Sequence, residues 1–377
     1  MILSFAGCPA PRAEAAPKPA RRIVYPNREP LMSQTVLESL NQAMHRMMQE
    51  DERVHLIGED LLDPYGGAFK VSRGLSTAFE DRVWTTPISE AGFVGVAIGM
   101  AMGGLLPVVE IMFGDFVLLA ADQLINHGAK YAWMYNEKVD VPLVVRLPMG
   151  GRRGYGPTHS QTLEKHFLGA PGLAIVATNP FVDSGQLLET ATRYDRRPVL
   201  FVENKKMYAR RQRPIQGGRC EAMAARISAG PYPSVSLSFG GFETADLTLV
   251  AYGGMAELAV EAAERLLIED ERYCEVVVPT SIQPLEMDAI AQSVARSGHL
   301  VVAEESPGAG GFSAEVISAL PAAAWAALRA QPQRVSALNL PIANSTALEA
   351  ATLPDVGDLL EAMRRVLPAS SSRSATG

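Results

Sequence analysis

Short apolar runs alternate with longer helical patterns along most of this 377-residue chain. The runs are rich in valine, isoleucine and leucine, which is typical of strands buried on both faces of a parallel sheet. Between the runs, apolar residues recur at the three- and four-residue spacing of amphipathic helices. The predicted strands cover residues 54–57, 82–85, 143–147, 173–177, 199–202, 247–251, 274–278, 300–303 and 335–338. The predicted helices cover residues 35–50, 72–80, 91–102, 116–134, 183–194, 255–269, 285–296 and 312–328.

This alternation predicts an α/β protein of two doubly wound domains with mostly parallel sheets. The folded part is expected to begin where Thr35 and Glu38 have the spacing of a helix capping box. The alternation lapses in a stretch rich in Pro, Gly and Ser, as expected of a crossover between domains. The predicted organisation is a first domain at residues 32–213, a linker at 214–245 and a second domain at 246–368. Residues 1–31 are expected to be a disordered or mis-assigned extension, and residues 369–377 a disordered tail.

Composition narrows the class of protein further. The 34 basic and 41 acidic residues give a net charge of −7, which disfavours general binding to nucleic acid or anionic membranes. The three cysteines, Cys8, Cys220 and Cys274, are odd in number and far apart, so they predict no disulfide framework and favour a reducing cytoplasm. The apolar window 91–112 is interrupted by glycines and Pro107, so we interpret it as buried core and not as a membrane span.

The segment 86–93, T-P-I-S-E-A-G-F, places Glu90 between a predicted strand and a glycine-rich apolar helix. Gly95, Gly99 and Gly103 fall four residues apart on one stripe of this helix. Each glycine costs about 1 kcal/mol relative to alanine in a helix interior, so the stripe indicates that a bulky group approaches closely. A carboxyl at the head of such a helix would be short of water and could hold or share a proton. Alternatively, it is an ordinary acid stabilised by the helix dipole.

Other candidate groups follow the predicted strands, where ligands of parallel sheets usually bind. Glu59 follows the first strand and could hold an amine-bearing ligand or relay to the buried glutamate, although a solvated acidic turn fits equally well. The loop 148–161, P-M-G-G-R-R-G-Y-G-P-T-H-S-Q, carries Arg152, Arg153 and His159. A histidine there can donate a proton near neutral pH. The arginines can bind a carboxylate or phosphate, or they can be ordinary surface charges.

Basic residues cluster once, just after the strand predicted at 199–202. A solvated edge is the simpler interpretation of this cluster, and docking of an acidic partner domain is the alternative. The histidines lack metal-ligand spacing, so no metal site is predicted on this chain. The cluster consists of Lys205, Lys206, Arg210, Arg211 and Arg213.

Together these motifs resemble the β subunit of the thiamine-diphosphate-dependent 2-oxo acid dehydrogenase E1 components, which include pyruvate, branched-chain and acetoin types. The resemblance covers nearly all of residues 33–367, in many segments at matching intervals. The segments are G-E-D at 58–60, Y-G-G-A-F at 65–69, V-S-R-G-L at 71–75, T-P-I-S-E-A-G-F at 86–93, D-Q-L-I-N at 122–126, H-S-Q at 159–161, P-G-L at 171–173 and E-N-K-K-M-Y at 203–208.

The resemblance implies a pyrimidine-binding first domain, a transketolase-type C-terminal domain and an α2β2 heterotetramer with thiamine diphosphate at the α/β interface. Glu90 matches the glutamate that hydrogen-bonds N1′ of the aminopyrimidine, with Glu59 behind it and Phe116 lining the pocket. His159 matches the histidine implicated in proton transfer during reductive acylation of a lipoyl group. The implied reaction is oxidative decarboxylation of a small 2-oxo acid, with acyl transfer to a lipoylated E2 protein.

The chain lacks a segment resembling the G-D-G…N-N motif of this superfamily. An E1 α subunit is therefore expected to hold Mg²⁺ and the diphosphate, and this chain alone is expected to be inactive. Ile282-Gln283-Pro284 stands where family members often have I-R-P, and the loop carrying Arg152 and Arg153 is more basic than expected for pyruvate-type members. These departures leave the substrate and the acyl acceptor open, so acyl or ketol transfer to a non-lipoyl acceptor is one alternative. A non-catalytic scaffold subunit is a separate alternative, against which the presence of Glu90, Phe116 and His159 together weighs.

Overall fold

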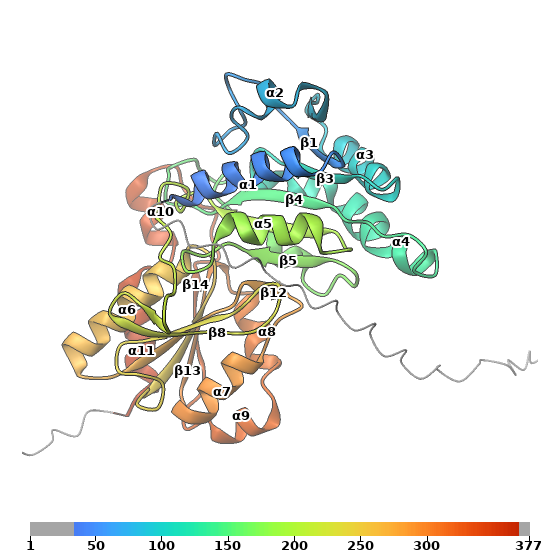
Figure 1. Ribbon diagram of the computed structural model, residues 1–377. Coiled ribbons are helices and arrows are strands. Elements are labelled where there is room, and N and C mark those ends of the chain that lie inside the picture. The colour runs from blue at the N-terminus through green and yellow to red at the C-terminus, as the bar shows by residue number, and fades with distance from the viewer. Residues whose placement is uncertain (1–33, 369–377) are drawn as a thin grey trace, which may run out of the picture.

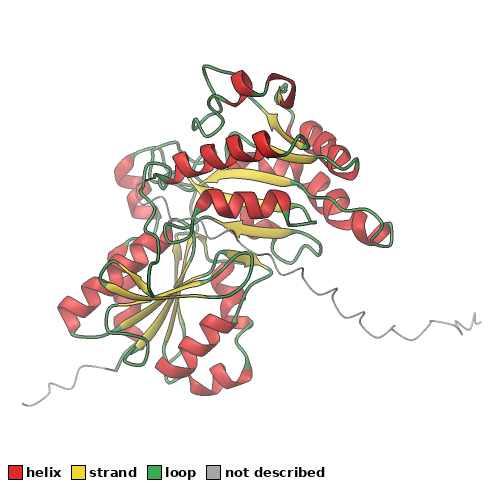
Figure 2. Cartoon of the chain, in the orientation of Figure 1, coloured by secondary structure: helices red, strands yellow, loops and turns green. Residues whose placement is uncertain are grey.

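The computed structural model describes residues 34–368, so the predictions for residues 1–31 and 369–377 lie outside it. Two seven-stranded sheets form the centres of two layered halves, which Figure 1 shows one above the other. Helices flank both sheets, as Figure 2 shows by secondary structure. The predicted α/β fold with mostly parallel sheets is confirmed.

The first sheet is parallel except for one edge strand that comes from the second half of the sequence. Strands β3, β4 and β6 are buried along their full lengths, as expected of central strands covered on both faces. The strand order is β12 (Ser281–Gln283), β5 (Ala174–Ala177), β6 (Val199–Asn204), β4 (Val144–Met149), β3 (Leu106–Glu110), β1 (Val54–Gly58) and β2 (Val83–Thr85).

The second sheet is mixed. Its parallel part comprises β14, β13, β10 and β11, and antiparallel strands complete the other edge. The strand order is β14 (Gln333–Ala337), β13 (Leu300–Pro307), β10 (Leu247–Ala251), β11 (Cys274–Val278), β9 (Val235–Ser238), β8 (Met223–Ile227) and β7 (Arg219–Cys220).

The helices cover these sheets with their apolar faces. The predicted capping box is confirmed, because Thr35 and Glu38 exchange hydrogen bonds at the start of α1, which packs on α5. The α-helices are α1 (Val36–Glu50), α2 (Leu75–Ala78), α3 (Glu90–Met102), α4 (Ala129–Met134), α5 (Ser184–Arg193), α6 (Met255–Asp270), α7 (Asp288–Ser297), α8 (Phe312–Ser318), α9 (Ala322–Ala327), α10 (Thr346–Thr352) and α11 (Val356–Val366). Shorter helical turns are η1 (Glu80–Arg82), η2 (Gly114–Ala120), η3 (Gln123–Gly128) and η4 (Glu164–Phe167). Within residues 34–368, no helix combines the length and apolar character needed to cross a bilayer.

Several segments differ from the sequence-based expectation, among them β12, which was not predicted, and the helix predicted at 312–328, which is divided into α8 and α9. The interval 214–245 contributes strands β7, β8 and β9 to the second sheet and is more than a connection. Strand β3 was not predicted, because Pro107 interrupts its apolar run and two glycines precede it. The helix predicted at 116–134 is divided into a 3₁₀ turn, a π turn and an α-helix.

Strand β12 ties the two halves together by joining the first sheet beside β5. The side chain of Gln283 accepts a hydrogen bond from the backbone of Gly169 at 2.5 Å. Its amide nitrogen donates to the carbonyls of Ala170 and Leu173, both at 2.9 Å. The residue that departs from the family tripeptide thus serves as a contact between the halves.

Candidate active site

The predicted site residues all follow neighbouring parallel strands of the first sheet. Glu59 follows β1, Glu90 begins α3 after β2, Phe116 lies in η2 after β3, and His159 lies in the loop after β4. Because these strands are parallel, their carboxyl ends meet at one edge of the sheet. The structure therefore places the four residues along the edge where ligands of such sheets bind.

Glu90 and Glu59 form a buried acidic pair. They are 4% and 6% exposed, although Glu90 is the first residue of α3 and Ser89 provides no side-chain cap. Burial raises the pKa of Glu59, and the nearby Glu90 and Asp60 raise it further, against a hydrogen bond from the Ser89 backbone. Oε1 of Glu59 has no hydrogen-bond partner among the residues described. Such a pair favours sharing a proton or accepting an N–H group from a ligand.

An aromatic cluster surrounds the half-buried His159. Its ring meets the rings of Phe113 and Phe116 edge-on, with centroids 4.6 and 5.3 Å away. Tyr155 also contacts Phe113 edge-on, at 5.7 Å. Nδ1 of His159 lies 2.9 Å from the hydroxyl of Thr158. The cluster offers flat apolar walls beside a titratable imidazole.

Polar contacts within the first half of the chain hold the loop 148–161, which carries His159 and is called the histidine loop below. The sequence did not indicate these contacts. Oδ1 of Asp115 accepts hydrogen bonds from both the backbone and the side-chain amide of Gln161, each at 3.0 Å. Nζ of Lys205 donates to the carbonyl of His159 at 2.7 Å. Lys205 is 1% exposed, and burial lowers its pKa to about 8. The interpretation of the basic cluster as a solvated edge is therefore wrong for Lys205. Its position directly after β6, at the carboxyl end of a strand, was the feature of the sequence that could have indicated a place in the site.

The two arginines of the loop have different surroundings. The guanidinium of Arg152 donates to the carbonyl of Pro354 in the second half, so this side chain contributes to an interdomain contact. Arg153 is exposed, and its guanidinium lies 5.5 Å from the ring centroid of Tyr155 and 5.8 Å from that of Phe69. Arg153 therefore lies against the aromatic side of the site, where its Nη1 also donates to the carbonyl of Lys205 at 3.1 Å.

A buried ionic network links three central strands of the first sheet. Arg146 on β4 donates to both carboxylate oxygens of Glu203 on β6, at 2.7 and 2.8 Å, and to Glu110 on β3 at 2.6 Å. The hydroxyl of Ser72 donates to Glu110, and that of Tyr208 donates to Glu203 at 2.6 Å. Burial alone would lower the pKa of Arg146, but the two carboxylates raise it above its ordinary value. The guanidinium therefore stays charged and links the strands that carry the site.

Another buried acid, Glu164, lies between the two halves of the chain. The Tyr252 hydroxyl donates to its Oε1, while its Oε2 has no hydrogen-bond partner in the described range 34–368. Burial raises the pKa of Glu164 to about 7; the hydrogen bond from Tyr252 opposes the rise, and Glu304 and Glu305 add to it.

Protein stability should consequently fall as pH rises through about 7. The raised pKa of Glu164 contributes stability that is fully present below its ordinary value of 4.5 and lost above about 7. The lost free energy of unfolding is on the order of 3 kcal/mol. Glu164→Gln keeps an acceptor for Tyr252 and should remove this dependence, as urea unfolding at about pH 5 and about pH 8.5 would measure. The exposed Glu315→Gln is the control, and equal pH dependence in Glu164→Gln and the unchanged protein would contradict the assignment.

The comparisons with known families cover both halves of the chain. The transketolase pyrimidine-binding domain matches residues 33–211, and the transketolase C-terminal domain matches residues 242–359. Among solved structures, a split gene transketolase described as an inactive beta4 tetramer has a similar fold, with a TM-score of 0.65 and 19% identity. The match covers 88% of this chain and 98% of that one.

Curated relatives are similar over most of their length. The pyruvate dehydrogenase E1 component subunit beta-1, mitochondrial, of Arabidopsis thaliana is 34% identical over 332 residues, which is 88% of each chain. The pyruvate dehydrogenase E1 component subunit beta of Rickettsia conorii is 34% identical over 336 residues, or 89% of this chain and 98% of the relative. The mitochondrial counterpart of Saccharomyces cerevisiae is 34% identical over 338 residues, or 88% of each chain.

Proposed function

The chain belongs to the 2-oxo acid dehydrogenase E1 β subunits of the transketolase superfamily, and from this membership we propose that it supplies the pyrimidine-binding half of a thiamine diphosphate site. The observation that carries the proposal is the buried pair Glu59 and Glu90 at the carboxyl edge of the first sheet. The other half of the site, including Mg²⁺ and diphosphate binding, belongs in this proposal to an α subunit in an α2β2 assembly. The expected domain boundaries and site roles remain predictions.

The residues at the sheet edge fit an aminopyrimidine ring. Oε1 of Glu59 is a buried acceptor with no partner among the described residues, and Glu90 is buried beside it. Phe116 presents an aromatic wall from η2, which packs on α3. Thiamine diphosphate, when bound, supplies the nucleophilic carbon that allows a 2-oxo acid to lose carbon dioxide.

Each protein group has a defined task in this proposal. Glu90 shares a proton with a ring nitrogen of the cofactor, and burial keeps water from competing for that proton. Glu59, whose pKa is raised by burial and by Glu90, stays neutral more readily and limits repulsion between the two acids. His159 holds a proton at the rim of the site, where the acyl acceptor arrives.

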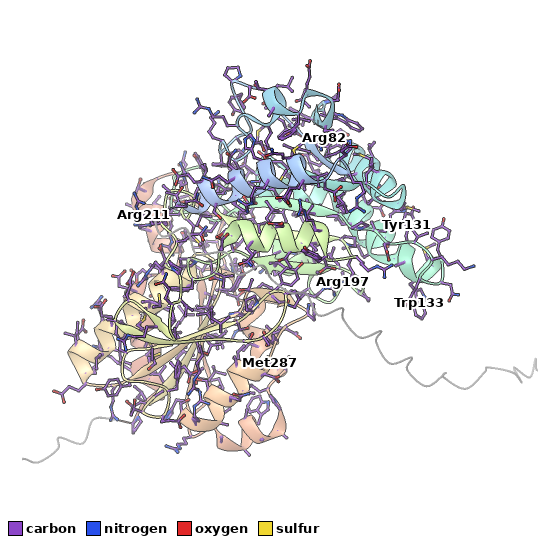
Figure 3. The ribbon with its side chains drawn as sticks, in the orientation of Figure 1. Arg82, Tyr131, Trp133, Arg197, Arg211 and Met287 are labelled. Carbon is purple, nitrogen blue, oxygen red and sulfur yellow. The ribbon has the colours of Figure 1, made fainter. Side chains whose placement is uncertain are left out.

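An exposed apolar face beside Glu90 supports the placement of the α subunit. On α3, a Cβ atom added at Gly99 would have no neighbouring atom within 4 Å, so the helix is open there to a closely approaching partner, whereas a Cβ atom at Gly95 would lie 3.3 Å from Oε1 of Gln123. Figure 3 shows Tyr131 and Trp133 at the outer end of this same domain. The exposed apolar side chains on α3, on the segment before it, on η2 and on α4 are Ile88, Val96, Leu118, Leu119, Trp133 and Met134.

The defining experiment is decarboxylation by this chain with and without its α subunit. The assay contains thiamine diphosphate, Mg²⁺, a dye as electron acceptor and a panel of 2-oxo acids headed by pyruvate, which the relatives' names suggest. Activity is expected only in the mixture. A stable, cofactor-loaded mixture that decarboxylates no 2-oxo acid would contradict the proposed reaction, and a mixture that binds no cofactor would favour a scaffold subunit.

His159→Ala should slow acyl transfer much more than it slows decarboxylation. Acyl transfer to a lipoylated E2 protein is expected to fall by about 100-fold or more, because a general acid contributes about that much. Dye-linked decarboxylation should change far less, since the aromatic pocket remains. Phe116→Leu provides a comparison, because it alters the pocket wall without removing a proton donor. Equal losses in both assays for His159→Ala would place the histidine earlier in the reaction.

The role of the loop arginines in substrate or acceptor recognition also remains a prediction. Arg153 supports it by its exposed position beside Tyr155 and Phe69, whereas the contact between Arg152 and Pro354 favours a structural task for Arg152. The cytoplasmic location expected from the cysteines likewise remains a prediction, since some relatives are named as mitochondrial.

A further inference from the structure

The loop that carries His159 is bound on its outer side by two carboxylates of the second half of the chain. Oε1 of Glu305 accepts the backbone N–H of Gly151 at 2.7 Å. Glu349 accepts the N–H groups of Arg152 and Gly154 with its two separate oxygens, at 2.8 and 2.9 Å. In Figure 1, α10, which carries Glu349, lies beside the first domain although it comes from the far end of the sequence.

The backbone of this loop is shaped to receive an anion. Gly150, Arg152 and Gly154 have φ values of +92°, +67° and +71° and alternate with residues of ordinary φ. Such alternation turns successive N–H groups toward one side and forms an anion-binding concavity. Glu305 and Glu349 are 7% and 2% exposed, so the concavity is filled by the chain's own buried carboxylates.

Close packing accompanies these hydrogen bonds. A side-chain carbon at Gly151 would lie 2.6 Å from Cδ1 of Leu353 and 3.2 Å from Oε1 of Glu349. Arg152 is a non-glycine residue at positive φ, a conformation that persists only where its surroundings hold it. Its backbone bond to Glu349 and its side-chain bond to Pro354 both come from the second domain.

The same loop reaches His159 five residues after Gly154. On its inner side, Lys205 binds the carbonyl of His159 and Asp115 binds Gln161. The loop is therefore fixed between the two domains, with carboxylates from the second domain on one side and a buried lysine on the other. A change at Glu349 should move the imidazole relative to its aromatic walls.

We propose that Glu349 is a positioning residue, which latches the His159 loop to the C-terminal domain and so sets the geometry for acyl transfer. The effect on acyl transfer rests on the function proposed above for His159, whereas the latch itself does not. Because one carboxylate serves two amides, glutamine in its place can accept only one of the hydrogen bonds and sets its own N–H against the other donor.

The test is made in the complex with the α subunit. Glu349→Gln weakens the contact between Glu349 and the loop from the side of α10, and Gly151→Ala weakens it from the side of the loop. Hydrogen–deuterium exchange of the amides of Gly151, Arg152 and Gly154 should become about tenfold faster in both variants, corresponding to about 1.4 kcal/mol. Modification of His159 by diethyl pyrocarbonate should accelerate, while the exposed His166 serves as the internal reference. Leu348→Ala, an exposed substitution on the same helix, should change neither measurement.

A functional readout completes the test. The ratio of lipoyl acyl transfer to dye-linked decarboxylation should fall about tenfold in Glu349→Gln, a split that general destabilisation would not produce. Unchanged amide exchange in both variants would overturn the latch, and faster exchange with unchanged His159 modification would overturn the positioning role. If the unaltered complex transfers no acyl group, the proposed function fails, while exchange and modification still decide whether the latch exists.

Discussion

Glu90→Gln is expected to lower dye-linked decarboxylation by the reconstituted enzyme by at least about 100-fold, the effect of losing a positioned acid–base group. Glutamine keeps the size of the side chain and its place at the start of α3, but it cannot share a proton with a ring nitrogen. Because Glu90 is 4% exposed, water cannot readily replace the lost carboxyl. The measurement is kcat with the α subunit at saturating thiamine diphosphate, Mg²⁺ and 2-oxo acid.

The substitution also removes the charge that helps to raise the pKa of Glu59, so that pKa should fall. Glu80→Gln is a suitable control, because Glu80 is exposed on η1 of the same domain and should tolerate the change. Both variants should assemble with the α subunit and unfold at similar urea concentrations. Near-normal turnover in an assembled Glu90→Gln complex would exclude Glu90 as the proton-sharing group.

The arrangement of strands could be predicted because it depends on local pattern. Continuous apolar runs marked strands such as β4 and β6, and Glu59 and Glu90 could be placed at the carboxyl edge because Glu59 directly follows β1 and Glu90 lies between β2 and the helix after it. The apolar pattern is weaker in β3, where a proline interrupts it, and in the antiparallel strands β7 to β9, which are short and lie in a stretch rich in Pro, Gly and Ser.

The contacts that hold the histidine loop could not be predicted in the same way. Glu349 lies 197 residues from Arg152, and Glu305 lies 154 residues from Gly151, so only the docking of the two domains brings them together. Lys205 was misplaced because a run of basic residues resembles a solvated surface, whereas its burial depends on the packing of the loop above β6. Long-range polar contacts of this kind leave no periodic signal in a single sequence.

Arg146→Met should be the most destabilising single change beneath the site, with a loss of about 3–5 kcal/mol in the free energy of unfolding. Methionine fits an apolar strand, but it leaves the buried carboxylates of Glu110 and Glu203 without their shared cation. Urea unfolding followed by circular dichroism would measure the loss. Arg365→Met is the control: Arg365 pairs with Glu361 on the exposed side of α11, and such a surface pair is worth at most about 1 kcal/mol.

A second substitution distinguishes loss of charge compensation from loss of packing. Adding Glu203→Gln to Arg146→Met removes one uncompensated carboxylate while leaving an amide oxygen that can still accept the hydrogen bond from Tyr208. The double variant should therefore be more stable than Arg146→Met alone, because an unpaired buried charge costs more than a missing ion pair. If the double variant is less stable, the charge of Glu203 itself supports the fold, and uncompensated charge does not explain the loss in Arg146→Met. If the double variant regains stability but not decarboxylation, the network has a second role. It then also aligns the ends of the strands that precede Glu59, Phe116 and His159.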